Sequence, residues 1–406
     1  MTAQDPATRS SRNSFLTIAQ LVISLGGAFV SILAAAFLLI ADRFTQTQPG
    51  IDRTGLGQIN QLVVMLLLLA FAGIPSIVLC IRWLRGIEPG EAKSNRWLLV
   101  ASFLLIVWLG ALYGGALLLN NGQSSPFLLV VDLFLIALPL IWLLGLALHR
   151  IKAGSWKRFW GLVAGTFYIT LPIILIVESI ILITAILAAS ALPGFQDFFN
   201  QLSALATSST ESLDQMLNEL APVLASPQAM YTLIFGFGLL IPLVEEFLKP
   251  LMLWLFSRRH LTPSQGFAMG LISGAAFALV ESLFALNAAG GEDYYAIVLG
   301  RTGTGLLHTF TTGMMGWALA STWHDGHGLR LGLIYSGVVI LHGIWNSFAI
   351  VMGFGSLPFQ LPGTVSDLAE AAPWILGLMA VWMLTILYVM NRRLAQEDQP
   401  TQPTLV

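Results

Sequence analysis

Apolar runs of about 20 residues or more follow one another along the chain and are separated by short polar segments. A helix that spans a bilayer needs about 20 predominantly apolar residues. Ten runs reach this length: residues 15–41, 59–81, 97–119, 127–148, 159–190, 231–256, 265–288, 299–322, 331–352 and 373–391. The pattern predicts an all-α polytopic membrane protein with about ten transmembrane helices. A membrane β-barrel is excluded, because its strands are short and alternate between apolar and polar residues.

The composition supports this class and limits the partners. Of the 406 residues, 56% are hydrophobic and 10% are charged, whereas a soluble domain carries roughly 25% charged residues. We therefore expect an integral membrane protein surrounded by a lipid bilayer. The net charge of −2 gives no basic footprint, so we expect no nucleic-acid partner. The single cysteine, Cys80, excludes an intrachain disulfide and a cysteine metal cluster.

Basic residues predict the orientation, because Lys and Arg are retained on the cytoplasmic side of a membrane. Placing the N-terminus inside assigns 15 of the 19 basic residues to the cytoplasm: Arg9, Arg12, Arg82, Arg85, Lys93, Arg96, Arg150, Lys152, Lys157, Arg158, Arg258, Arg259, Arg330, Arg392 and Arg393. Arg43 and Arg53 fall in outside loops, Arg301 at an outer helix end and Lys249 within a helix. We therefore expect both termini in the cytoplasm.

The apolar runs and the loops between them divide the chain into four regions. We predict an N-terminal five-helix membrane region at 1–192, an extracytoplasmic segment at 193–230, a four-helix catalytic core at 231–352, and a last transmembrane helix with a cytoplasmic tail at 353–406. The extracytoplasmic segment carries four acidic residues and no basic one. Its residues 210–220 place Leu213, Met216, Leu217 and Leu220 on one helical face. This amphipathic helix is expected at the outer bilayer face, either as a lid or as an ordinary connector.

Ionisable residues gather within the sixth to ninth apolar runs. These residues are Glu245, Glu246, Lys249, Glu281, His308 and His342. Charges in the bilayer core are costly, so such residues indicate a functional site. At 1.5 Å per residue, the acids and histidines lie roughly 12 to 21 Å below the outer helix ends. Four antiparallel helices can hold them in one layer between the midplane and the outer leaflet. Each residue alone could simply be a packing or hydrogen-bonding residue, and it is the cluster that favours a functional site.

Two prolines flank the adjacent acids of the sixth run. Pro250 removes a helical hydrogen bond and clashes with the carbonyl of Glu246, which predicts a kink beside the acids. Glu245 and Lys249 are spaced i,i+4 and can pair. Two adjacent carboxylates cannot both ionise cheaply in a low dielectric, so one of them is suited to act as a general base and then as an acid.

Small residues form a stripe on the seventh run and lead to its acid. Gly266, Gly270 and Gly274 are spaced for close helix approach. Phe277 and Glu281 continue the same face. On the ninth run, His342 and Asn346 share a face, and a side-chain amide there can fix the imidazole tautomer or donate to an oxyanion. Together, one Glu and two His are similar to a catalytic zinc site with a position left for water.

Four short motifs carry a family resemblance over residues 231–352. They are Glu245-Glu246-x-x-Lys249, Phe277-x-x-x-Glu281, His308 followed by Gly313 and Gly316, and His342-Gly343-x-x-Asn346. In this order the chain resembles the PrsW family of intramembrane proteases, within the wider group of CAAX-protease and bacteriocin-processing proteins. CAAX prenyl endopeptidases have a histidine in the second motif, so Glu281 points to PrsW. That branch often has an acid where Asn346 stands.

The resemblance implies hydrolysis of a peptide bond within the membrane of a bacterium. Glu245 or Glu246 activates water, with Glu245 favoured by analogy, while Glu281, His308 and His342 bind Zn²⁺ or orient the water directly. Asn346 supports the oxyanion, and Lys249 and Phe277 support the site. The implied substrate is a single-span or tail-anchored membrane protein; known family members cleave a membrane-anchored anti-sigma factor on its outer side.

Two other functions fit the buried acids. A transporter or channel uses such acids as a proton relay, but transporters usually show repeated halves and helices broken at matching positions, and the sequence shows neither. A catalytically silent scaffold that binds membrane partners through the same groove is the second alternative.

Overall fold

The structure is a computed structural model that describes residues 6–46, 56–92, 95–120, 126–192, 195–197, 199–200, 203, 226–255, 261–287, 294–326, 328–355 and 363–397. These residues are almost entirely helical, and the only β pairing among them is an isolated bridge between Glu91 and Ser155. The predicted all-α class is therefore confirmed. The predicted amphipathic helix at 210–220 lies outside the described residues.

Each of the ten predicted runs overlaps a helix or a series of consecutive helices. These are α1 (Pro6–Gln46), α2 (Leu56–Ala72) with α3 (Ile74–Leu84), α4 (Asn95–Asn120), α5 (Pro126–Ala147), α6 (Trp156–Gly165) with η1 (Thr166–Thr170) and α7 (Leu171–Ser190), α10 (Pro227–Phe235) with η2 (Gly236–Leu240), α11 (Ile241–Leu248) and α12 (Leu251–Trp254), α13 (Pro263–Asn287), α14 (Tyr294–Asp325), α15 (Gly328–Gly355) and α16 (Gly363–Glu397). Within the described chain, eight helical stretches are long and apolar enough to cross a membrane. The other two series are α10–α12, which is broken after Leu248, and α14, which carries polar side chains along its length.

The chain divides into two compact units whose segments alternate along the sequence. The first unit comprises Met1–Pro172, Lys249–Gly328 and Ile386–Val406, and the second comprises Ile173–Leu248 and Leu329–Thr385. The boundary at Leu248 coincides with the end of α11, where Pro250 precedes α12. The predicted proline break beside the two acids is therefore confirmed. The division into four regions proposed from the sequence stays a prediction.

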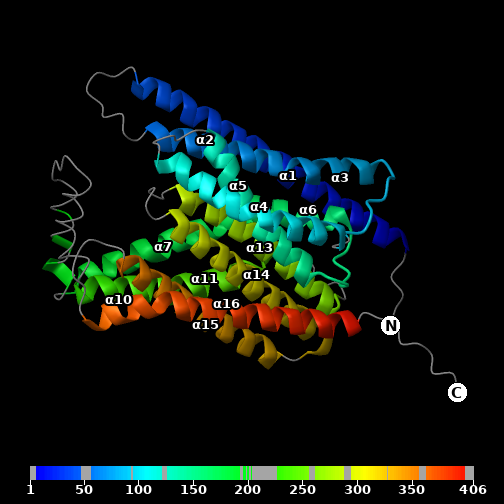
Figure 1. Cartoon of the computed structure of the whole chain (residues 1–406). Coiled ribbons are helices and arrows are strands. Elements are labelled where there is room, and N and C mark those ends of the chain that lie inside the picture. The colour runs from blue at the N-terminus through cyan, green and yellow to red at the C-terminus, as the bar shows by residue number, and fades with distance from the viewer. Residues whose placement is uncertain are drawn as a thin grey trace. The chain divides into compact units, whose positions relative to one another are not determined.

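The core of the first unit is the pair α13 and α14, which lie side by side (Figure 1). Gly266 faces the backbone of Gly316, Gly270 faces that of Thr312, and Gly274 faces the carbonyl of His308. A methyl group on any of these three α13 glycines would overlap the backbone of α14. The glycine stripe therefore brings the two helices into backbone contact, as its spacing predicts.

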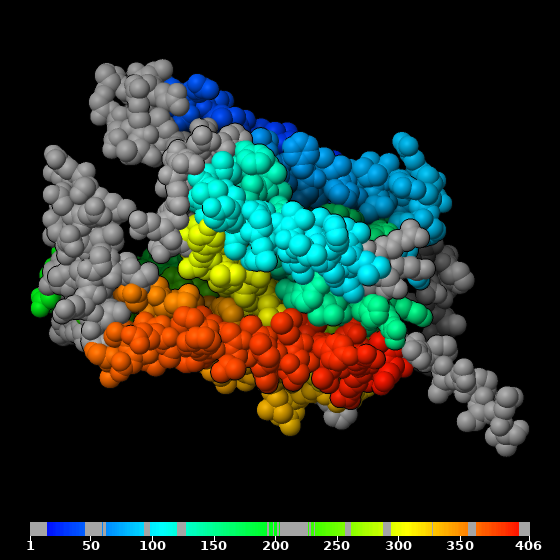
Figure 2. Space-filling view, in the orientation of Figure 1, coloured from blue at the N-terminus to red at the C-terminus, as the bar shows by residue number. Residues whose placement is uncertain are grey.

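The outer helices of the first unit expose large apolar side chains. Phe103 and Ile106 of α4 are 69% and 72% exposed, and Phe29 and Phe37 of α1 are similarly open. Figure 2 shows α4, in cyan, at the surface of this unit. Long apolar faces of this kind are compatible with lipid rather than with water.

The second unit contains a close contact between α15 and the η2–α11 segment. The backbone of Gly343 lies against the carbonyl of Gly238. Tyr335 donates a hydrogen bond of 2.8 Å from its hydroxyl to the Leu243 carbonyl. η2 is a π-helical turn, an element that is rare and frequent at functional sites. These contacts fix the face of α11 that carries Glu245 and Glu246 against α15.

Candidate active site

His308 is the centre of a buried cluster in the first unit. It is 1% exposed, and its Nδ1 lies 2.6 Å from Lys249 Nζ, while its Nε2 lies 2.7 Å from Glu281 Oε2. A lysine ammonium group only donates hydrogen bonds, so Nδ1 is the acceptor. The proton of a neutral imidazole is then on Nε2, facing the Glu281 carboxylate. The cluster therefore selects one tautomer of His308.

The same Oε2 of Glu281 contacts a second residue, Arg301, which the sequence motifs do not assign to the site. Arg301 NH2 lies 2.9 Å from Glu281 Oε2, and Arg301 Nε donates a 3.2 Å hydrogen bond to Ser282 Oγ. The signal that indicates Arg301 is its position on α14, seven residues before His308 and hence on the same helical face. Arg301 therefore positions Glu281 and compensates its charge.

Lys249 and Phe277 complete this cluster. Lys249 is fully buried, and its Nζ lies 4.8 Å from the centroid of the Phe277 ring. That ring meets the imidazole of His308 edge-on, with centroids 5.2 Å apart. The sequence predicts Glu245 as a partner for Lys249 through their i,i+4 spacing, but it gives no signal for His308. The structure brings Lys249 onto His308, and Phe277 provides the aromatic wall beside both.

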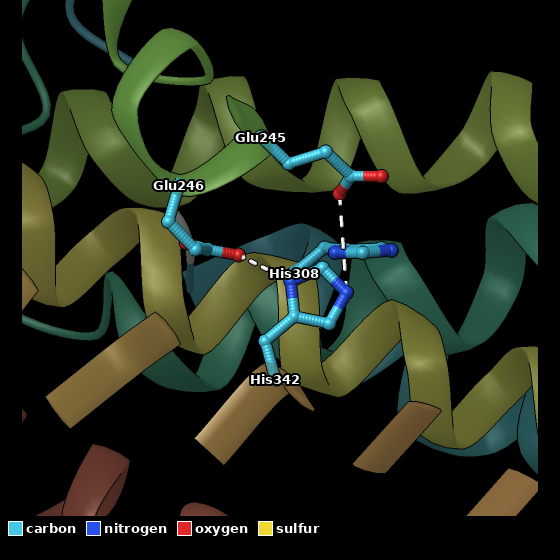
Figure 3. Close-up of side chains that lie close together, drawn as sticks. All are labelled: Glu245, Glu246, His308 and His342. Carbon is cyan, nitrogen blue, oxygen red and sulfur yellow. Dashed lines mark hydrogen bonds and ion pairs between the residues drawn. The ribbon is translucent and has the colours of Figure 1, made fainter. Parts of the chain in front are cut away.

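A second buried cluster lies in the second unit, around His342. The Nδ1 of this histidine lies 2.9 Å from Glu246 Oε1, and its Nε2 lies 3.9 Å from Glu245 Oε2 (Figure 3). Glu246 is fully buried and Glu245 is 6% exposed. The two adjacent acids of α11 thus face the two nitrogens of one imidazole ring. A carboxylate on one ring nitrogen is the arrangement that orients metal-ligating histidines.

The separation of Glu245 and His342 is compatible with a metal ion between them. A distance of 3.9 Å is too long for a hydrogen bond. Two ligands that each bind a tetrahedral Zn²⁺ at about 2.0–2.2 Å lie about 3.4 Å apart, so a shift of about half an ångström would bring these two atoms onto one ion. The donor types, a carboxylate oxygen and an imidazole nitrogen, are those that zinc prefers. The residues of this cluster therefore fit a metal site.

Asn346 lies one turn after His342 on α15, and its amide is engaged with the backbone. Its Nδ2 donates a 2.9 Å hydrogen bond to the carbonyl of Phe237 in η2. The amide thus ties α15 to the π-helical turn that precedes α11. The oxyanion role given to Asn346 by the sequence stays a prediction.

One known family matches the chain. The profile described as PrsW family intramembrane metalloprotease matches residues 157–366, which are 210 of the 406 residues. The chain belongs to the PrsW family. It is therefore an intramembrane protease and an integral membrane protein. Among curated proteins and solved structures, nothing matches the chain.

The PrsW match covers both clusters and excludes most of the N-terminal helices. Every predicted site residue lies within it, and so does Arg301. Helices α1 to α5 precede it. Membership of the PrsW family favours a protease over the transporter, channel and silent scaffold as the function of the buried acids. The same description makes a metal ion part of the family's chemistry.

Proposed function

We propose that this protein hydrolyses a peptide bond of a membrane-anchored protein with a water molecule activated by Glu245. The observation that carries the proposal is the placement of His342 between two adjacent carboxylates, with Glu246 at 2.9 Å and Glu245 at 3.9 Å. The contact with Glu246 has the length of a hydrogen bond. The contact with Glu245 is too long for one, and a metal ion could lie between its two atoms. This asymmetry supports different roles for the two acids, with Glu245, which the family resemblance favours, as the base.

Glu246 is the positioning residue of this pair. It is fully buried and contacts Nδ1 of His342, so it fixes the ring with Nε2 directed towards Glu245. Glu245 then takes a proton from water as the water oxygen attacks the scissile carbonyl carbon. The same carboxylic acid returns the proton to the amine nitrogen as the C–N bond of the tetrahedral intermediate breaks. Asn346, one turn from His342, is proposed to support the oxyanion.

The two clusters are proposed to form one active site. Glu246 and Lys249 are three residues apart in the chain, so covalent continuity alone keeps the residue that contacts His342 close to the residue that contacts His308. The shared depth expected for Glu281, His308 and His342 within the bilayer supports the same conclusion.

Zn²⁺ is the proposed metal. The donors would be the carboxylate of Glu245 or Glu246 and the imidazole of His342, with His308 as a further donor once the ion displaces Lys249 from its Nδ1. A bound zinc ion lowers the pKa of its water and polarises the scissile carbonyl. Glu281, the third ligand predicted from the sequence, contacts both Arg301 and His308. We therefore propose that Glu281 orients His308 rather than binding the ion.

The substrate is proposed to be a single-span or tail-anchored protein of a bacterial plasma membrane, such as an anti-sigma factor, cut in the outer half of the bilayer. This rests on the family resemblance, on the depth expected for the acids and on the basic residues that predict cytoplasmic termini. A membrane-embedded substrate also suits this site, because the side chains of four of its residues are almost fully buried: Glu245, Glu246, His308 and His342.

Cleavage of single-span reporter proteins by purified protein tests the function. Glu245→Gln, which keeps shape and removes the base, is expected to abolish cleavage while thermal unfolding stays unchanged. Metal analysis of detergent-purified wild type and His342→Ala tests the ion: zinc bound to the wild type and absent from His342→Ala supports the metal site. Full activity without bound metal would contradict a role for zinc. Glu245 would then activate the water without a metal ion. Normal cleavage by folded Glu245→Gln would overturn the mechanism.

A further inference from the structure

A cavity of about 400 Å³ lies within the first unit. It is bounded by α1, α6, the end of α3 and α12, and its lining includes Leu16, Gln20, Trp83, Lys157, Arg158 and Leu255. Small-molecule sites in proteins occupy about 300–1,000 Å³. The cavity is therefore large enough to hold part of an organic ligand, and none of the proposed catalytic residues lines it.

The polar wall of the cavity is built around Lys157. Its Nζ donates a 2.6 Å hydrogen bond to Thr17 Oγ1 and lies 3.9 Å from the centroid of the Trp83 ring. Gln20 Nε2 donates to the carbonyl of Lys157 at 3.0 Å. Arg158, the next residue, has its backbone N–H capped by Ser155 Oγ at 3.3 Å. Lys157 is thus held by its side chain and Arg158 by its backbone, so two adjacent basic residues begin α6.

The surroundings of this wall are basic. The segments 82–92 and 150–158 contain six basic residues, Arg82, Arg85, Arg150, Lys152, Lys157 and Arg158, and two acids, Glu88 and Glu91. Backbone hydrogen bonds from Ala92 to Gly154, 2.9 Å, and from Trp156 to Gly90, 3.0 Å, join the two segments. Of the residues that line the cavity, Glu88 is the one acid. The positive charge selects an anionic ligand.

Much of the rest of the lining is apolar. Leu16 and Ile23 of α1, Leu162 of α6 and Leu255 after α12 belong to it. The ligand that fits a lining of both cationic and apolar side chains is amphiphilic. Basic pockets between transmembrane helices on the cytoplasmic side bind the headgroups of anionic lipids, and this end of the first unit is the one that the basic residues assign to the cytoplasm.

We propose that this cavity binds an anionic phospholipid, with its phosphate at Lys157 and Arg158 and an acyl chain along Leu16, Leu162 and Leu255. The proposal is independent of proteolysis, because no catalytic residue takes part in it. The lipid would lie against Met252 of α12, a helix that begins two residues after Lys249. A lipid bound in the cavity would therefore stabilise α12, the helix that follows Lys249 in the chain.

Lipid titrations of the full chain in detergent, followed by native mass spectrometry, test the proposal. Wild type is expected to bind phosphatidylglycerol in preference to phosphatidylcholine. Lys157→Gln and Arg158→Gln should each weaken phosphatidylglycerol binding about fivefold. Ala19→Phe fills the cavity without changing charge and should weaken binding as well. Arg85→Gln removes an exposed charge from the same end but not from the cavity lining, and should leave binding unchanged.

Three outcomes would overturn the proposal. Equal binding of the two lipids would remove the anionic preference. Equal losses in Arg85→Gln and Arg158→Gln would show diffuse attraction rather than a site. Competition by inorganic phosphate at the affinity of the lipid would identify a free phosphate as the ligand and leave the apolar side chains of the lining without a role. Thermal unfolding of each variant checks its folding, and because Arg158→Gln and Ala19→Phe leave the Lys157–Thr17 bond in place, the test holds even where Lys157→Gln unfolds.

Discussion

The Nζ of Lys249 lies 2.6 Å from Nδ1 of His308, a residue 59 positions later in the chain. Both side chains are almost completely buried. Because the ammonium group can only donate, it determines which nitrogen of His308 carries the ring proton. The lysine therefore acts on the site through the histidine, and its removal should affect catalysis more than folding.

Lys249→Met should reduce cleavage about 10- to 100-fold, the range typical of the loss of a residue that supports a metal ligand. Methionine keeps most of the volume but has no donor for Nδ1. The measurement is the initial rate of reporter cleavage, with thermal unfolding as the check on folding. Lys152→Met, at an exposed lysine of the first unit, is the matched control. Unchanged cleavage by folded Lys249→Met would show that the contact with His308 has no catalytic role.

Arg301→Gln should also lower cleavage, because Glu281 then loses the cation 2.9 Å from its Oε2. Arg301→Lys keeps the charge but not the guanidinium geometry, so it should restore part of the activity. A purely structural role predicts instead that activity follows the amount of folded protein in both variants. Rates normalised to folded protein distinguish the two cases.

Glu245, Glu246 and His342 should behave as one unit in double-mutant cycles. Removal of one essential member of a catalytic group abolishes most of the rate, and a second removal adds little. Glu245→Gln, His342→Ala and the double variant are therefore expected to have nearly the same residual rate. Losses that multiply across the pair would indicate independent structural contributions.

Gly270→Ala should destabilise the first unit, because the added methyl group would overlap the backbone of Thr312 on α14. Overpacking of this kind costs about 1–3 kcal/mol. Gly110→Ala on α4 is the control, since nothing lies within 4 Å of the added methyl group, and alanine is favoured over glycine within a helix. The midpoint of thermal unfolding should fall for the first variant and stay level or rise for the second.

Glu178→Gln should leave cleavage unchanged. Glu178 lies on α7, and it belongs to neither of the two clusters. The paired variant is Glu281→Gln, which is expected to lose cleavage. The reverse result, with Glu178 essential and Glu281 dispensable, would move the active site to α7.

The sequence by itself determined the class of the protein and the positions of its helices, and it supplied most of the residues that we propose for the site. A transmembrane helix is a local property, since it depends on about 20 consecutive apolar residues, and each predicted run overlaps helix in the structure. The break at Pro250 and the contact face of Gly266, Gly270 and Gly274 are local in the same sense. Steric requirements within a few turns of one helix are sufficient to predict them.

The pairings within the site were decided by the tertiary structure alone. Lys249 contacts His308, Arg301 contacts Glu281, and Asn346 contacts the Phe237 carbonyl. The π-helical turn that contains Phe237 is not predicted by the apolar pattern of its run. Each pairing depends on which helices become neighbours and on the rotation and shift of each helix about its axis. Those quantities come from packing over the whole length of a helix pair, and a displacement of one turn, about 5.4 Å, would give every buried charge a different partner.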